Sequence, residues 1–102
     1  MLAKKRKIKR KIKSSRQMER HLKGMANHYR IEILMIVGED RGITLEDIIE
    51  KTGANPKTIG EHTCRLYLAG LINKKRRSNF IEHELSPYGR KFVQFLKSFQ
   101  YD

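Results

Sequence analysis

The sequence predicts a single, mainly α-helical domain that carries one small β-hairpin. Apolar residues recur at steps of three and four through most of residues 15–69 and again near the C-terminus, which is the spacing of helices with one buried face. Between these stretches, residues 71–75 and 80–85 have the character of two strands separated by a turn. At 102 residues the chain holds one core, and we expect a basic arm over residues 1–14 and a domain over residues 15–102.

The first helical stretch begins near Ser15 and is interrupted at Gly24. Its apolar stripe consists of Met18, Leu22, Met25 and Tyr29. Asn27 suits the N-cap of a second helix over residues 28–38, because its side-chain oxygen can accept a backbone N–H from the first turn. The buried stripe of this second helix is expected to be Ile31, Leu34 and Val37, flanked by Ile33 and Met35.

The clearest organisational signal is a pair of short helices separated by three residues. Thr44, with Asp47 three positions later, marks the start of the first helix, and Gly53 marks its end. Asn55 and Pro56 mark the start of the second helix, which is expected to run to residue 69. The core-facing residues are expected to be Leu45, Ile48 and Ile49 in the first helix and Ile59, Thr63 and Leu66 in the second. Two helices at this separation form a helix-turn-helix.

A hairpin and a final helix complete the chain. The hairpin turn is expected at residues 77–79, and Ser86-Pro87 repeats the pattern of an N-cap followed by proline. The last helix carries an apolar stripe of Phe92, Phe95, Leu96 and Phe99. This order of elements is that of a winged helix-turn-helix domain.

Residues 22–86, about two thirds of the chain, resemble the winged helix-turn-helix of the ArsR and MarR families of transcription regulators. The matching segments are Leu22–Asn27, Arg30–Leu34, Ile48–Gly53, Thr58–His62 and Leu68–Ile72, with Leu85–Arg90 resembling the corner between strand and helix. The resemblance implies a DNA-binding regulator, and the basic arm lies outside it. The cysteine pair of many metal-sensing ArsR-like proteins would align with Thr44 and Glu46, so that motif is missing here.

The formal net charge of +12 is concentrated in two places. Residues 1–13 hold eight Lys and Arg and no acid, and residues 74–77 read KKRR. Together these two runs equal the whole net charge, so the remainder of the chain is near neutral. Basic charge on this scale indicates a polyanionic partner. Nucleic acid is favoured over a membrane surface, because Ile8 and Ile12 alone make a poor membrane-inserting face.

In this architecture the second helix of the motif enters the major groove of DNA. Lys57 and Thr58 suit phosphates, Arg65 suits a phosphate or a guanine edge, and Glu61 suits N4 of cytosine. The predicted contacts of this helix are Lys57, Thr58, Gly60, Glu61 and Arg65, beside an exposed Cys64. Those of the hairpin, on the backbone or in the minor groove, are Lys74, Lys75, Arg76, Arg77 and Asn79, with Arg77 preferred for the groove. Those of the arm are Lys4, Lys5, Arg6, Lys7, Lys9, Arg10 and Lys11.

Several other classes of protein are not indicated. The apolar run 33–37 is too short for a transmembrane helix, and no signal-peptide pattern follows the basic start. A single cysteine forms no internal disulfide, so we expect a cytoplasmic, nucleoid-associated protein. The sequence holds no phosphate-binding loop, nucleophile elbow or paired metal motif, so we expect no enzyme, cofactor or metal. His62 is expected to pack beneath its helix, and Cys64 to be a bystander.

The apolar stripes of the first and last helices exceed what one small core can bury. Pairing across a two-fold axis would cover the excess and set two recognition helices on successive half-sites, so a homodimer on double-stranded DNA is expected. The dimerisation residues are then Met18, Leu22, Met25, Phe92, Phe95, Leu96 and Phe99. Two alternatives stay open, namely sequence-independent, chromatin-like binding of DNA or RNA dominated by the arm, and a winged helix that serves as a protein-interaction module.

Overall fold

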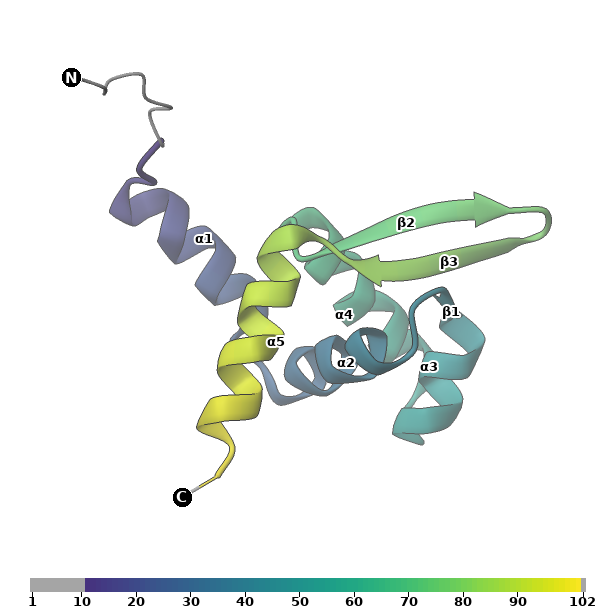
Figure 1. Ribbon diagram of the computed structural model, residues 1–102. Coiled ribbons are helices and arrows are strands. Elements are labelled where there is room, and N and C mark those ends of the chain that lie inside the picture. Colours follow the sequence, from purple (N-terminus) through teal and green to yellow (C-terminus); the bar gives the residue numbers. More distant parts are fainter. Residues whose placement is uncertain (1–10, 102) are drawn as a thin grey trace.

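The computed structural model describes residues 11–101, and within them the chain forms five helices and a three-stranded sheet (Figure 1). The elements are α1 (Ser15–Met25), α2 (His28–Glu39), β1 (Ile43–Thr44), α3 (Leu45–Thr52), α4 (Pro56–Leu68), β2 (Ile72–Arg77), β3 (Phe80–Leu85) and α5 (Pro87–Phe99). The predicted class, mainly α with a small β-hairpin, is confirmed. Of the predicted arm, residues 1–10 lie outside the described residues, and residues 11–14 have no regular structure.

Local capping signals set the helix boundaries where the sequence predicts them. Asn27 and Asn55 each accept two first-turn backbone N–H groups through their side-chain oxygens, and Thr44 accepts the N–H of Asp47. Gly53 closes α3 in the left-handed conformation, with φ of 66°, which glycine adopts without steric cost. At the start of α1, Ser14 and Gln17 form a reciprocal capping box that was not predicted from the sequence.

The core lies between α2 and the elements around it. Helix α2 contacts α3, α4, β3 and α5, so it is covered on more than one side. Leu34 and Val37 are buried as predicted, but Ile33, expected only to flank the buried stripe, is completely buried. Ile31, expected in that stripe, is only half-buried. A single-stripe prediction was therefore wrong for α2, because a helix surrounded by neighbours buries a wider arc than a surface helix does.

The sheet contains a third strand that was not predicted from the sequence. Its order is β1-β3-β2, and all pairs are antiparallel. Strand β1 pairs Ile43 with His83 and Thr44 with Glu82. A two-residue strand shows no alternation, so it gives no signal in the sequence. Strand β1 therefore anchors the middle of β3, where the buried His83 ring donates from Nδ1 to the Ile43 carbonyl at 2.9 Å.

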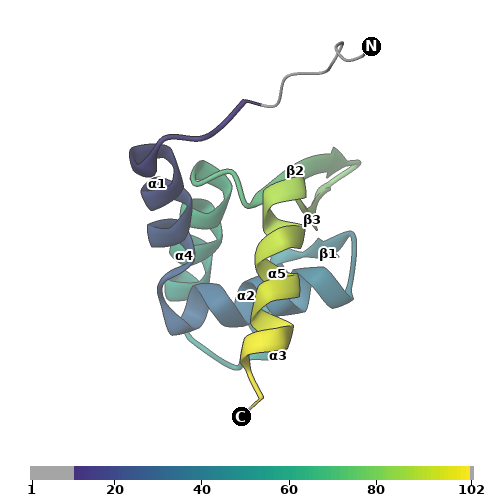
Figure 2. The same cartoon turned by 60° about the vertical axis from the view of Figure 1, so that its left-hand side comes forward.

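Helix α5 crosses the front of the molecule in Figure 2, with α1 and α4 beside each other at one side. Its buried face is formed by Gly89, Val93 and Leu96. Phe95 and Phe99 of the predicted stripe are 53% and 70% exposed. At 100° per residue, the direction of Phe95 and Phe99 is rotated about 110° from the buried face.

The position of α5 follows from Gly89, where the Cβ of any other residue would lie on the Leu71 carbonyl oxygen. This close approach holds the first turn of α5 against the start of β2. Two predicted dimerisation residues, Met25 and Leu96, belong to the core of the protomer and are not available to a partner. Phe92 is partly buried, whereas Met18 and Leu22 are exposed.

Candidate nucleic-acid interface

Helix α4 presents one buried face and one solvent face. Its buried residues are Ile59, Thr63 and Leu66, which is the trio predicted from spacing. The predicted contact positions all lie outside this trio; Lys57, Glu61, Cys64 and Arg65 are exposed, and Thr58 and Gly60 are partly exposed. A Cβ added at Gly60 would meet no atom within 4 Å, so the surface of α4 is open there.

The cap of α4 determines how its first turn can meet an anion. The Asn55 side-chain oxygen accepts the backbone N–H groups of Lys57 and Thr58 at 2.9 and 3.2 Å. Because these two amides already have an acceptor, a phosphate at this end is left with the side chains of Lys57 and Thr58 and the positive end of the helix dipole. The phosphate contacts predicted for Lys57 and Thr58 are therefore expected from their side chains and not from their backbone N–H groups.

The opposite flank of α4 is held against the start of α2 by aromatic packing. The His62 ring stacks on Tyr29 with 5.4 Å between centroids, and the His28 ring lies 4.2 Å from the same tyrosine ring. Burial lowers the pKa of His62, and the nearby cations Arg30 and Arg65 lower it further. The lowered pKa favours the neutral form of the partly buried ring, which packs on Tyr29 between α4 and α2. Among residues 11–101, no three His, Cys, Asp or Glu side chains gather as a metal site.

The β2–β3 hairpin projects from the helices as the wing of the fold (Figure 1). Its turn places Ser78 in the left-handed region, with φ of 55°. Alternation divides the strands into two faces. On the inner face, Lys74 and Arg76 continue the line of the buried Ile72. On the outer face, Lys75 stands opposite Glu82 and Arg77 opposite Phe80.

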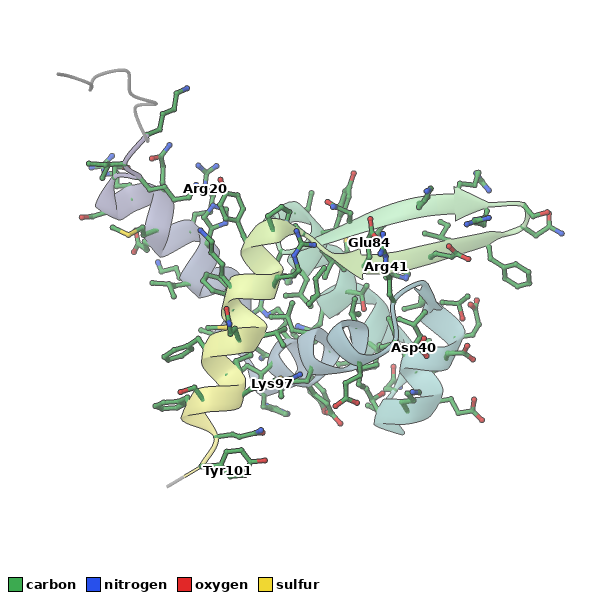
Figure 3. The ribbon with its side chains drawn as sticks, viewed as in Figure 1. Arg20, Asp40, Arg41, Glu84, Lys97 and Tyr101 are labelled. Carbon is green, nitrogen blue, oxygen red and sulfur yellow. The ribbon has the colours of Figure 1, made fainter. Side chains whose placement is uncertain are left out.

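Acidic residues of β3 partly neutralise the outer face of the wing. Arg77 Nε lies 3.6 Å from Glu82 Oε1, and Arg41 Nε donates to Glu84 Oε1 at 2.9 Å (Figure 3). Within residues 11–101, Lys74 and Arg76 of the inner face form no ion pair, and neither does Lys75 of the outer face, so the neutralisation affects Arg77. The sequence-based preference for Arg77 in the minor groove did not consider Glu82 and Glu84 of β3. The alternation of charge along β3 was the signal that could have located them.

The inner face of the wing is also tied to α4. Lys74 Nζ lies 4.9 Å from the ring centroid of Tyr67, an exposed residue in the last turn of α4. The unpaired cations of the wing and the helix of the predicted major-groove contact therefore belong to one continuous surface.

The end of the predicted arm is held beside the start of α5. Lys13 Nζ donates to the Tyr88 hydroxyl at 2.8 Å and lies 4.1 Å from the centroid of its ring. The hydrogen bond and the charge of Lys13 lower the pKa of Tyr88. Lys11 is exposed, and Lys4, Lys5, Arg6, Lys7, Lys9 and Arg10 lie outside the described residues.

No protein-family model and no curated protein matches the chain. Solved structures do. HlyU from Vibrio cholerae has a TM-score of 0.76 at 18% identity over 85% of this chain and 96% of that one. The transcriptional repressor PagR of Bacillus anthracis has a TM-score of 0.73 at 18% identity, covering 79% of this chain and 93% of that one.

A third neighbour is the homodimeric winged helix-turn-helix DNA-binding domain Mb0332 of Mycobacterium bovis, a possible ArsR-family transcriptional regulator. Its TM-score is 0.72 at 22% identity, and the match covers 84% of this chain and 85% of that one. The fold is a winged helix-turn-helix. At these identities the likeness establishes the fold, and the resemblance to winged helix-turn-helix regulators is confirmed at that level.

Proposed function

We propose that the chain is a DNA-binding transcription regulator whose helix α4 enters the major groove. The observation that carries this proposal is the continuous surface formed by the solvent face of α4 and the inner face of the wing. This surface has cations at Lys57 and Arg65 on the helix and at Lys74 and Arg76 on the wing, none of them in an ion pair within residues 11–101. Winged helix-turn-helix proteins dock the corresponding helix in DNA.

The roles of the residues follow from their positions. Lys57 and Thr58 contact phosphates, Arg65 contacts a phosphate or a guanine edge, and Glu61 accepts from N4 of cytosine. Gly60 lets the DNA approach the α4 backbone closely, since nothing covers that position. The wing, including Lys75, Arg77 and Asn79, and the arm bind the backbone or the minor groove. Among the structural neighbours, PagR is a transcriptional repressor and Mb0332 is a DNA-binding domain, and both support this assignment.

The test is selection of bound duplexes from a random pool at ~150 mM salt, a concentration at which nonspecific phosphate binding is weakened. We expect one enriched sequence that contains two half-sites. A variant with Lys57→Ala and Arg65→Ala should lose this preference, whereas Gln94→Ala, at an exposed position of α5, should keep it. Enrichment of no sequence, or the same sequence enriched by both variants, would contradict the proposal.

The partner of the regulator is proposed to be a second copy of the chain, through α1 and α5. Phe95 and Phe99 are stacked at 5.3 Å and exposed. Beside them, Met18, Leu22 and Phe92 line an apolar groove of about 280 Å³ between the two helices. Exposed apolar area of this kind indicates an interface. The homodimeric state of Mb0332 supports the same arrangement.

Sedimentation velocity tests the dimer. We expect a dimer at micromolar concentration, and a monomer for the variant with Phe95→Ser and Phe99→Ser. The control is Tyr101→Ser, an aromatic residue that is exposed after the end of α5. A monomeric parent protein would refute the dimer, and DNA binding by one protomer would then be measured separately.

A second candidate, sequence-independent nucleic-acid binding, is favoured by the concentration of charge in residues 1–13. Deleting residues 1–10 separates the two, because it removes most of that charge and leaves the contact of Lys13 with Tyr88 intact. In the regulator, sequence preference survives and the salt dependence of binding becomes shallower. Loss of all binding supports the second candidate.

For both candidate functions, we propose that the protein lies in the cytoplasm with the nucleoid. No helix of residues 11–101 is long and apolar enough to cross a membrane.

A further inference from the structure

The tip of the wing carries two exposed apolar side chains next to its cations. Phe80 and Ile81 are the first residues of β3, and they are 57% and 44% exposed. Strand β1 pairs with β3 only at Glu82 and His83, so the hairpin beyond that point consists of two strands without a covering element. Neither apolar side chain belongs to the core cluster. Core packing therefore does not account for their presence at this position.

The register sets each apolar side chain beside an arginine. Phe80 is paired with Arg77 on the outer face, and Ile81 is paired with Arg76 on the inner face. The tip thus has the same composition on both faces, an apolar group flanked by a guanidinium. Only the outer face also holds an acid, Glu82, against its arginine.

We propose that Phe80, the more exposed of the two, is an apolar wedge that the wing inserts into the minor groove of DNA, where it partly unstacks one base step; Ile81 points to the opposite face of the hairpin and does not enter that step. This inference rests on the proposed function. Apolar side chains inserted between base steps from the minor groove kink the duplex, and flanking cations hold the backbone on either side. Lys74, Lys75 and Arg76 supply those cations from the neighbouring strand.

The observations favour DNA over a membrane surface or a protein groove. Four consecutive cations on the six-residue strand β2 complement two phosphate backbones. The turn itself consists of the polar residues Ser78 and Asn79, so these two residues would enter a partner before the apolar side chains do. A polar tip of this kind suits a groove with polar edges and opposes insertion into acyl chains. Lys74 ties the wing to α4 through Tyr67, so a wing in the minor groove is compatible with α4 in the adjacent major groove.

The experiment uses the full chain and the duplex recovered by selection, with 2-aminopurine placed at successive steps of the sequence flanking each half-site. We expect binding to raise the fluorescence at one step, because 2-aminopurine brightens when it is unstacked. Phe80→Ala should lose this signal and bind about tenfold more weakly, the scale of one lost base-stacking contact, whereas Ile81→Ala, on the opposite face, should keep the signal. The salt dependence of Phe80→Ala should be unchanged, since no charge is removed.

Two matched variants separate a wedge from general weakening. Phe80→Leu retains an apolar side chain of a kind that can insert between base steps, and it should keep the fluorescence change. Arg76→Ala should keep it as well, while reducing the slope of log affinity against log salt by about 1. Since both apolar side chains are exposed, the circular dichroism melting curves of all variants should match the parent curve.

Three results would overturn the wedge, and they are distinguishable. A duplex that binds without any fluorescence change would show that the wing lies on the backbone, and the proposed function would stand. Unchanged duplex binding by Phe80→Ala, with loss of binding to vesicles of anionic phospholipid, would make the tip a membrane contact. Absence of duplex binding by the parent protein would refute both the wedge and the proposed function.

Discussion

Replacing Gly60 with Ala separates the stability of α4 from its function. Glycine inside a helix costs about 0.8–1.0 kcal/mol relative to alanine, because its unfolded backbone has more freedom to lose. The new Cβ at Gly60 would meet no atom within 4 Å, so no steric penalty offsets this gain. We therefore expect Gly60→Ala to raise the free energy of unfolding by about 0.5–1 kcal/mol. Urea denaturation followed by circular dichroism measures this change.

The same methyl group should weaken DNA binding. It stands on the solvent face of α4, one turn after Lys57 and next to Glu61, where the proposed complex brings the duplex against the helix. Displacing the helix from the groove should cost about tenfold in affinity, comparable with one lost base contact. Fluorescence anisotropy with the selected duplex measures the affinity, with Gln94→Ala as the control on α5.

Opposite changes in stability and affinity are the expected signature. If stability rises while affinity stays the same, the DNA does not approach α4 at Gly60, and the proposed docking is wrong. If stability falls, the reasoning from open space and helix propensity is wrong. A parallel fall in both quantities would likewise refute the stability reasoning, and the docking would then be judged from the variant with Lys57→Ala and Arg65→Ala.

Three further predictions concern the framework of the wing and α5. Gly89→Ala should cost about 3 kcal/mol or more and leave little folded protein by circular dichroism, because its Cβ would overlap the Leu71 carbonyl oxygen. Ser86→Ala should cost about 1–3 kcal/mol in urea denaturation, since the buried Ser86 hydroxyl donates to Gly70 at 2.6 Å and caps α5; a change near zero would contradict this. Burial lowers the pKa of His83 below its ordinary value of 6.5, so the unfolded chain binds a proton that the folded chain does not as pH falls below 6.5. Stability should then be complete above pH 6.5 and fall below it by up to about 1.4 kcal/mol per pH unit, with a shallower slope in His83→Asn; equal slopes would refute this role.

Local features of this protein could be predicted from its amino-acid sequence. Asn27 and Asn55 cap their helices, Gly53 closes α3, and Ser86 starts α5, as predicted. These signals are reliable because a cap acts on backbone groups within one turn of itself. The buried trio of α4 was also predictable, because that helix has one face on the core and one in solvent. The order of such elements was enough to indicate a winged helix-turn-helix.

Other features depend on neighbours distant in the chain and emerge only in the folded domain. Ile33 is buried more deeply than Ile31, because several elements surround α2. Phe95 and Phe99 of α5 face outward, because Gly89 permits a close approach on another face. Arg77 is paired with Glu82, and Arg76 has no ion pair among residues 11–101. The basic run of the wing could be recognised in the sequence. Which of its cations face a partner depends on the cross-strand register, and the register is a property of the folded hairpin.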